Sequence, residues 1–364
     1  MDSLTSPAPR QAHYRRIADG IRGQILDGTW TPGVQLPATD KLADTWNASY
    51  GTVHTALQSL AKEGWLERLD GSGTFVTEFK NRFACAGIYH SIDIFATEES
   101  AFSRALHTSL VKQLGALDKE TQVFVDSRPE ADQRTLLPAL TDAIRLRRIQ
   151  CLVAPTLNGI DAPSLARLRL PSAFTVNPTS PNQVIFDMKS MLRESVRQLA
   201  NQGCRSAGLI SHIIPGNPTE LMARFYEFFD EAVREHGLAT REEWIRRPAQ
   251  PTTEFERYGY RAFKALWHLP DRPEGVIVYP DLVARGVISA VLELGVREIP
   301  SRMKFVFHRN AFSRPLCPFP ATWAVSDVER VAAELIKLIQ HQFAGEKTAP
   351  VFLDHAFENA GPEI

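Results

Sequence analysis

Hydroxyl, amide and ring side chains gather between Ser49 and Gln58, where their spacing suits hydrogen bonding to another molecule. Apolar residues recur at helical spacing in this stretch, and they are Val53, Ala56, Leu57 and Leu60. On a helix that buries this stripe, the outward residues are Tyr50, Gly51, His54, Thr55 and Gln58. Ser49 is well placed as the N-cap. Such a helix fits the major groove of DNA, with its N-terminal side chains nearest the base edges.

A second set of polar side chains follows short apolar runs later in the chain. Asp187 follows residues 183–186, and Asp281 lies just past residues 276–278. A carboxylate at a strand end can accept hydrogen bonds from two adjacent sugar hydroxyls. For both residues, N-capping of the following helix is the alternative.

Weaker candidates of the same kind are His90, Ser91, His308 and Asn310. His90 and Ser91 follow an early strand, and the run His308-Arg309-Asn310 follows the apolar residues 305–307. That second run suits a different or anionic ligand. Its alternative role is a hinge held by hydrogen bonds.

The elements that must position the first set are three helices and a two-stranded wing. Residues 1–12 are expected to be disordered. Ile17, Ile21 and Ile25 then mark one face of a helix, and Pro37 is expected to open a second helix. Residues 66–69 and 74–77 alternate as strands, joined by a glycine-containing turn. The sequence therefore predicts a winged helix-turn-helix over residues 13–77.

The charge and composition limit the classes of partner. The 364-residue chain has a formal net charge of −1, with 44% hydrophobic and 23% charged residues. Eight basic and eight acidic residues between positions 10 and 80 cancel, so non-specific DNA binding should be weak. The four dispersed cysteines favour buried reduced thiols over a metal cluster or disulfide framework. Without a signal segment or a membrane-length apolar run, a cytoplasmic protein is expected.

Beyond a short linker, residues 78–83, the pattern changes to alternating strands and helices. Strands are expected at 84–89, 122–125, 151–154, 173–176, 183–186, 206–210, 276–278 and 305–307. Helices are expected at 102–117, 136–146, 188–202, 219–236, 258–267 and 282–294. Repeated strand–helix units predict an α/β fold of parallel sheets flanked by helices.

Residues 13–77 resemble the GntR family of bacterial transcription regulators. The resemblance lies in Leu36-Pro37 before the second helix, Ser49-Tyr50-Gly51-Thr52-Val53, the phrase Glu-Gly-Trp-Leu at 63–66, and Gly-x-Gly-Thr-Phe-Val at 71–76. It implies double-stranded operator DNA as a partner. The predicted DNA contacts are Lys41, Ser49, Tyr50, Gly51, Thr52, His54, Arg68, Gly71 and Gly73. The chain departs from the family at Asp40, Tyr50 and His54, where the family usually has arginines, and this implies an altered operator.

Residues 84–345 resemble the effector domain of the LacI/GalR repressors, itself similar to periplasmic sugar-binding proteins. The resemblance lies in phrases that occur in order, at 184–187, 199–210, 224–229, 272–278, 281–286 and 295–300. It implies two lobes, residues 84–187 with 309–325 and residues 188–308 with 326–345, within an effector-binding domain spanning 84–364. A ligand in the cleft between the lobes is implied, and Arg224 matches the family's cleft arginine. A surface helix charge is the alternative for Arg224.

Together these features predict a DNA-binding transcription regulator, most simply a repressor controlled by a monosaccharide or related ligand. A homodimer is expected, because two DNA-binding domains on a palindromic operator give a higher specificity than one domain alone. No cofactor or metal is expected. The rival functions are an enzyme, as in GntR-type regulators with an aminotransferase-like domain, and a transport-linked sugar-binding protein. The chain is short for the first, and the DNA-reading module argues against the second.

Overall fold

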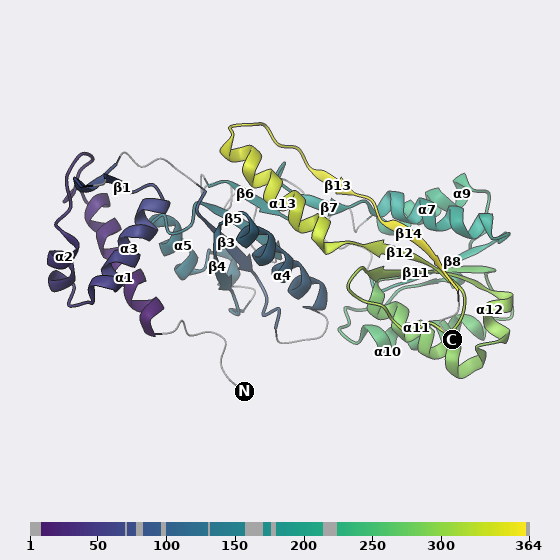
Figure 1. Ribbon diagram of the computed structural model, residues 1–364. Helices are drawn as coiled ribbons and strands as arrows, with labels where there is room; N and C mark the ends of the chain where they lie inside the picture. Colours follow the sequence, from purple (N-terminus) through teal and green to yellow (C-terminus); the bar gives the residue numbers. More distant parts are fainter. Residues whose placement is uncertain are drawn as a thin grey trace. The chain divides into compact units, whose positions relative to one another are not determined.

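The computed structural model describes residues 9–69, 71–77, 83–95, 100–129, 132–156, 170–175, 180–213 and 224–361 (Figure 1). The chain divides into two compact units. Unit 1 comprises Met1–Asp93, Val111–Ala173 and Ile336–Thr348, and unit 2 comprises Ile94–Leu110, Phe174–Leu335 and Ala349–Ile364. Within the described residues, no helix has both the length and the apolar character needed to cross a bilayer.

The N-terminal part of unit 1 is the predicted winged helix-turn-helix. Its elements are α1 (Pro9–Leu26), α2 (Thr39–Thr45), α3 (Tyr50–Lys62), β1 (Leu66–Leu69) and β2 (Gly73–Val76). The apolar faces of the three helices meet in one core, which includes Ile17, Ile21, Leu42, Val53, Leu57, Leu60 and Trp65. Burial of such side chains is the main favourable contribution to folding.

Two predicted boundaries in this part need correction. Residues 9–12 are not disordered, because α1 already begins at Pro9. Pro37 does not open the second helix, which begins at Thr39 after the extended N-cap residue Ala38. Residues 1–8 and most of the expected linker, residues 78–82, lie outside the described part.

The wing is an antiparallel pair in which Leu66 lies opposite Val76 and Leu69 opposite Gly73. Gly71 and Gly73 have φ values of +72° and +118°, which favour glycine over other residues. At Gly73 a Cβ atom would also lie 2.5 Å from Nε2 of Gln35. The two glycines are therefore required by the turn itself.

The first α/β sheet has four strands in the order β4-β3-β5-β6. These are β3 (Cys85–His90), β4 (Glu120–Val125), β5 (Cys151–Thr156) and β6 (Ser172–Phe174). The segments between strands contain α4 (Ala101–Ala116), the 3₁₀ turn η2 (Asp132–Arg134) and α5 (Pro138–Arg145). Strand β3 runs parallel to both β4 and β5, and all six of its residues are buried. A continuous buried run is typical of a parallel strand covered on both faces.

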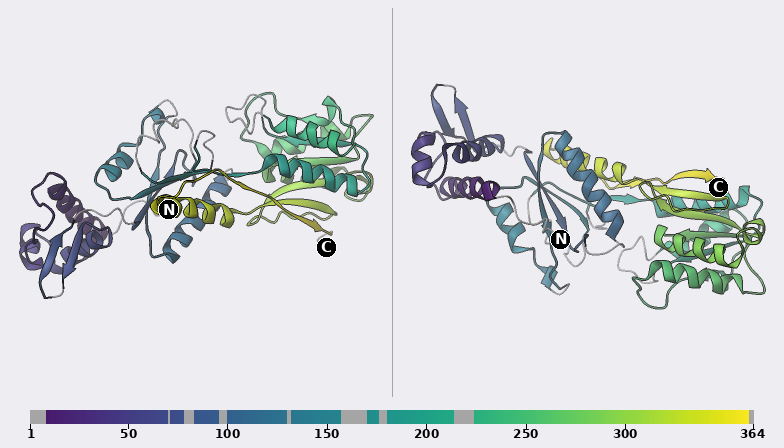
Figure 2. Two further views of the ribbon diagram at one scale, coloured as in Figure 1. Left: turned by 90° about the horizontal axis from the view of Figure 1, so that it is seen from above. Right: turned by 60° about the horizontal axis from the view of Figure 1, so that its bottom comes forward.

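The second sheet has six strands in the order β14-β12-β11-β10-β8-β9, and only β14 is antiparallel to its neighbour. They are β8 (Ala207–Ser211), β9 (Ile245–Arg246), β10 (Gly275–Tyr279), β11 (Lys304–Asn310), β12 (Ala321–Ser326) and β14 (Ala356–Ala360). Figure 2 shows this sheet between two groups of helices. One hydrophobic cluster packs α7 (Met188–Asn201) and α9 (Phe225–Glu235) onto the sheet, and a second packs α10 (Phe255–Trp267), α11 (Asp281–Gly295) and α12 (Glu298–Arg302). The turn η3 (Glu242–Trp244) precedes β9.

Two glycines allow α10 and α11 to pack closely. A Cβ atom on Gly286 would lie 1.9 Å from the carbonyl oxygen of Glu256, and one on Gly259 would lie 2.2 Å from that of Val283. Neither distance is physically possible, so larger residues would force the helices apart. These glycines hold α11, and with it Asp281, in place.

The remaining elements are a small parallel pair and a long helix, and they correct the predicted lobe boundaries. The pair consists of β7 (Val184–Phe186) and β13 (Val351–Leu353), and the helix is α13 (Val328–Phe343). Residues 309–325 were assigned to the first lobe, but β12 pairs with β11 in the six-stranded sheet. Residues 94–110 and 174–187 also cluster with unit 2, whereas residues 336–345, predicted for the second lobe, cluster with unit 1. The other predicted strands and helices up to residue 307 are found within a few residues, except that residue 176 of one predicted strand and residues 219–223 of one predicted helix lie outside the described part. The sequence analysis does not predict β9, α12, β12, α13, β13 or β14.

Candidate functional sites

Helix α3 begins with the predicted cap. The Ser49 side chain accepts a hydrogen bond from the backbone nitrogen of Thr52 at 3.2 Å, and the two hydroxyls lie 2.7 Å apart. Val53, Ala56, Leu57 and Leu60 are at most 1% exposed. The prediction of the N-cap and of the buried face is therefore confirmed.

The outward face of α3 presents an aromatic pair. Tyr50 is 58% exposed, and its ring stacks on that of His54 with centroids 6.0 Å apart. The Thr55 hydroxyl already donates to the carbonyl oxygen of Gly51 at 2.8 Å. Within the described chain, the side chains of Tyr50 and Gln58 form no hydrogen bond. The outward side chains of this face are thus uncharged or aromatic.

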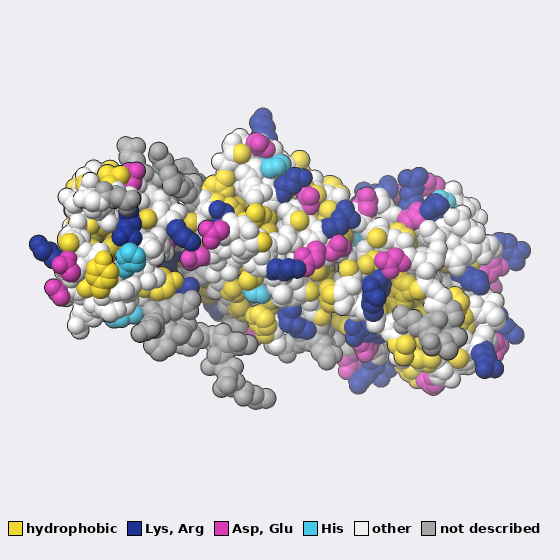
Figure 3. Space-filling model, in the orientation of Figure 1, with side chains coloured by type: hydrophobic (Ala, Val, Ile, Leu, Met, Phe, Trp, Pro, Cys, Tyr) yellow, Lys and Arg dark blue, Asp and Glu magenta, His cyan; other side chains and the backbone are white. Residues whose placement is uncertain are grey.

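The two predicted cations lie outside α3. Lys41 is exposed on α2 and Arg68 is exposed on β1, and neither forms an ion pair within the described residues. Asp40 accepts a hydrogen bond from the backbone nitrogen of Lys41 at 2.8 Å. A carboxylate in the first turn interacts favourably with the helix dipole, so Asp40 has a structural role here. On the face shown in Figure 3, acidic and basic side chains are interspersed.

At the carboxyl ends of the second sheet, the structure brings four polar residues into two hydrogen-bonded pairs. Asn310 donates from Nδ2 to Oδ2 of Asp281 at 2.8 Å, and Nε2 of His308 lies 2.8 Å from the hydroxyl of Ser326. All four residues are buried. Asp281 is the first residue of α11, whose N-cap is Pro280. The carboxylate thus does not act as the N-cap and instead accepts from Asn310.

Three histidines of unit 2 are held neutral by burial. Burial lowers the pKa of His308 to about 3, aided by the neighbouring charge of Arg309. Burial also lowers the pKa of His355 to about 3 and that of His212 to about 4. The rings of His308 and His355 have centroids 5.7 Å apart, and Tyr279 lies 4.8 Å from His308. Nδ1 of His308 and both ring nitrogens of His355 are buried and have no hydrogen-bond partner among the described residues.

His212 and His355 were not predicted as site residues. The sequence analysis selects polar residues that directly follow a strand, and we call this the strand-end rule. His212 directly follows β8, so the same rule could have identified it. His355 lies in the turn between β13 and β14 and reaches His308 only through the tertiary fold. No local sequence signal marks it.

Asp187 and Arg224 are arranged as in their alternative roles, an N-cap for Asp187 and a surface charge for Arg224. Asp187 caps α7, accepting from the backbone nitrogen and the hydroxyl of Ser190 at 2.9 and 2.8 Å. The Arg224 side chain is 46% exposed, and its Nε lies 2.9 Å from Glu227. Neither arrangement, by itself, points to a ligand.

The carboxyl ends of the first sheet carry a separate polar cluster around Asp126. His90 ends β3 and is fully buried, and Ser91 follows it. Asp126 accepts from Tyr89 at 2.8 Å and from Nε and Nη2 of Arg128 at 2.8 and 2.6 Å. The hydrogen bonds from Arg128 are the main cause that lowers the Asp126 pKa. Asp126 follows the predicted strand 122–125, so the strand-end rule could have found it.

Comparisons with known proteins agree with this two-part organisation. Residues 13–76 match the model of the gntR family of bacterial regulatory proteins, and residues 196–352 match that of the periplasmic binding protein-like domain. The fold therefore defines a winged helix-turn-helix joined to a periplasmic-binding-protein-like domain. The N-terminal domain is thus similar to the gntR regulators, and the C-terminal domain has the periplasmic-binding-protein-like fold.

The chain is similar to curated regulators and to solved structures. It is 23% identical to the arabinose metabolism transcriptional repressor of Halalkalibacterium halodurans, over 83% of this chain and 81% of that protein. A segment covering 18% of this chain and 27% of the relative is 45% identical to the mannosyl-D-glycerate transport/metabolism system repressor of Escherichia coli. A LacI-family regulatory protein from Chloroflexus aggregans superposes with a TM-score of 0.61 at 17% identity, over 75% of this chain and 96% of that chain.

Proposed function

We propose that this protein is a transcription repressor that binds double-stranded operator DNA and responds to a small neutral ligand, a monosaccharide or a derivative. The observation that carries the proposal is the combination, in one chain, of an uncovered recognition helix with a sheet of periplasmic-binding-protein type. A homodimer acting on chromosomal DNA in the cytoplasm is part of the proposal. The similarity to named repressors supports a regulatory rather than an enzymatic role.

The DNA-reading surface that we propose is the outward face of α3 together with the wing. Tyr50, His54 and Gln58 offer a phenol, an imidazole and an amide, and the free main-chain N–H groups of the first turn suit a phosphate oxygen. Gln commonly reads adenine, and an aromatic ring suits the thymine methyl group. Lys41 and Arg68 would contact phosphates. We therefore expect an operator with A·T pairs under α3.

We propose a ligand-contacting surface at the carboxyl ends of each sheet. In unit 2 it comprises Asp281, Asn310, His308, His212 and Tyr279. A carboxylate, an amide and neutral imidazoles can donate to and accept from sugar hydroxyls, and an aromatic ring can pack on a sugar face. In unit 1 the corresponding residues are His90 and Ser91, with the Asp126 cluster beside them.

The chemistry of these residues favours a neutral ligand over an anionic one. The alternative of an anionic ligand was suggested by His308 and Arg309. However, burial keeps His308 neutral, and Nη2 of Arg309 lies 2.6 Å from Glu358. Arg128 is likewise held by Asp126. Each guanidinium thus already has a carboxylate partner, which leaves little positive charge to attract an anion.

Selection of DNA from a random or genomic library by the full-length protein tests the DNA-binding part. We expect a palindromic sequence, and the Tyr50→Ala/His54→Ala variant should bind it at least tenfold more weakly without losing helical circular dichroism. Lys112→Ala, at an exposed position in α4 outside the proposed DNA-reading surface, serves as the control. Failure of the wild-type protein to enrich any sequence would contradict the proposal. An absorbance scan of the purified protein also tests the non-enzymatic role, because a bound chromophoric cofactor would count against it.

A further inference from the structure

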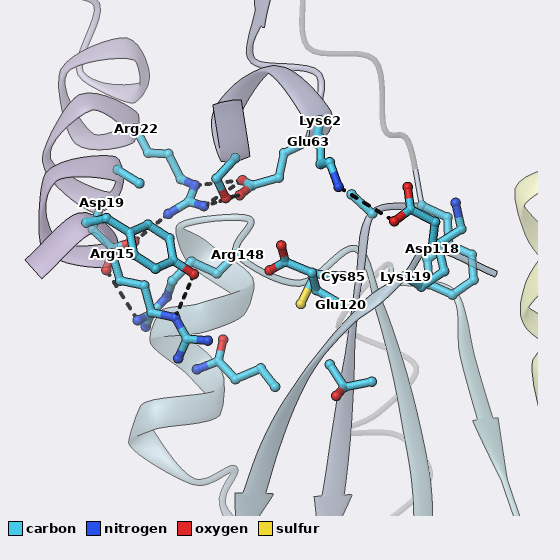
Figure 4. A pocket seen from close by; sticks show the side chains of 17 residues that line it. Arg15, Asp19, Arg22, Lys62, Glu63, Cys85, Asp118, Lys119, Glu120 and Arg148 are labelled. Atoms are coloured by element: carbon cyan, nitrogen blue, oxygen red, sulfur yellow. Dashed lines mark hydrogen bonds and ion pairs between the residues drawn. The ribbon is translucent and has the colours of Figure 1, made fainter. Parts of the chain in front are cut away.

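The strongest unassigned feature of unit 1 is a chain of charged side chains where the winged helix-turn-helix meets the first sheet. It borders a cavity of about 190 Å³. Figure 4 shows Asp19 and Arg22 on α1, Glu63 at the end of α3, and Arg148 on the opposite side. All of these residues belong to the same compact unit.

The helical side of this junction is built on a buried ion pair. Arg22 donates from Nε to Glu63 at 2.9 Å and from Nη2 at 2.5 Å, and the two side chains are 5% and 7% exposed. Ser59 also donates to Glu63 at 2.9 Å. Because Glu63 is the C-cap of α3, the recognition helix is fixed to α1 through this pair. Breaking one partner of such a pair leaves a buried charge, which is costly.

Asp19 extends the chain to the sheet. It accepts from Arg22 at 2.5 Å and from Nη1 of Arg148 at 3.3 Å. Asp19 and Arg148 are 25% and 24% exposed, so water screens their attraction only in part. Two weaker contacts lie beside it: Arg147 over the ring of Trp65 at 5.5 Å, and Lys62 with the exposed Asp118 at 3.7 Å.

The sheet side of the junction is tied to strand β3. Arg148 belongs to the turn between α5 and β5, in which Arg147 has a φ of +50°. The Gln150 side chain donates to the carbonyl oxygen of Arg147 at 2.8 Å and accepts from the backbone nitrogen of Cys85 at 2.8 Å. The junction thus holds the first residue of β3, whereas His90 is its last. A six-residue strand spans roughly 20 Å, so β3 joins the junction to the proposed ligand edge.

We propose that the Asp19–Arg148 contact is a joint that docks the DNA-reading domain on the amino edge of the first sheet. The joint lies between α1 and the turn before β5, whereas Tyr50 at the start of α3 stays exposed. Docking therefore leaves the DNA-reading face open. Through Arg22 and Glu63, the joint also steadies the last turn of α3. The inference rests on contacts within unit 1 and does not depend on the identity of the ligand.

Spin labels on the full-length protein, at Glu67→Cys in β1 and Lys112→Cys in α4, test the joint without ligand or DNA. The four native cysteines are buried, and burial raises the pKa of Cys85 to about 12, so the introduced thiols should react first. We expect a narrow distribution of distances between the labels. Arg148→Glu should widen it at least twofold, whereas Arg148→Lys, which keeps the charge, should leave it narrow.

Arg145→Glu is the matched control, because Arg145 is exposed three residues away and, within the described residues, its ion pair is with the exposed Asp142. It should not widen the distribution. Hydrogen exchange of the amides at 59–63 should become at least threefold faster in Arg148→Glu. If Arg148→Glu does not fold, Arg148→Gln replaces it. A broad distribution of label distances in the wild-type protein, or a narrow one in Arg148→Glu or Arg148→Gln, would overturn the proposal. Either result is independent of whether the protein binds operator DNA.

Discussion

Asp281 illustrates how one residue can support both the fold and a proposed site. Its carboxylate accepts from Asn310 in a buried setting and begins the helix packed against the end of β10. One oxygen, Oδ2, is occupied by Asn310. The other, Oδ1, is the oxygen proposed to accept from a ligand hydroxyl.

We expect Asp281→Ala to abolish sugar binding and Asp281→Asn to weaken it at least tenfold, because the neutral amide is a poorer acceptor. Isothermal titration calorimetry with a panel of monosaccharides and polyols measures this effect. Glu298→Ala, at an exposed position in the following short helix α12, is the control. Equal binding by Asp281→Ala and the wild type would remove Asp281 from the site.

The recognition helix shows what a single cap contributes at the scale of an element. The Ser49 hydroxyl accepts from the Thr52 nitrogen, which also donates to the Ser49 carbonyl oxygen at 3.0 Å in the first turn. The same turn carries Tyr50. Loss of the cap should therefore loosen the residues proposed to touch DNA before it affects the rest of the domain.

Ser49→Ala should cost about 1 kcal/mol of local stability, the usual value of an N-cap. This corresponds to roughly fivefold faster hydrogen exchange in the first turns of α3. Operator binding should weaken in parallel, whereas Ser59→Ala, which removes a hydrogen bond to Glu63 at the other end, should mainly affect the last turn. Exchange rates that are unchanged at residues 52–54 would contradict the assigned cap.

At the scale of the whole molecule, the buried histidines make stability depend on pH. The pKa values of His212, His308 and His355 lie well below their ordinary value of 6.5 in the folded state, chiefly because of burial. Because the folded protein binds protons at these histidines less readily than the unfolded chain does, their contribution to the free energy of unfolding is fully present above pH 6.5. This contribution is lost as the pH falls from 6.5 toward the folded pKa values of about 3 to 4.

Chemical denaturation between pH 7.5 and 5 checks this prediction. The free energy of unfolding of unit 2 should fall, with each of these histidines contributing at most about 1.4 kcal/mol per pH unit. His355→Leu should reduce the slope without loss of stability at pH 7.5, since neither ring nitrogen has a partner. His268→Leu, at an exposed position, should keep the wild-type slope. An identical slope in His355→Leu would refute the assignment.

The amino-acid sequence by itself determined the local elements and the order of the two domains. Periodic apolar residues and turn glycines act over a few positions, so α3, its Ser49 cap, the wing and the strands up to β11 other than the two-residue β9 could be predicted. The strand-end rule also reached Asp281 and Asn310, because a carboxyl end is a local property. The same rule, applied consistently, would have added His212 and Asp126.

Only the tertiary structure decided which distant segments meet. The assignment of 309–325 to the first lobe failed because sheet membership depends on hydrogen bonds between strands, and β12 pairs with β11 rather than with β3. His355 meets His308, and Arg148 meets Asp19, across 47 and 129 positions of the chain. Pairings over such separations leave no periodic trace in the sequence, because they arise only when whole elements pack together.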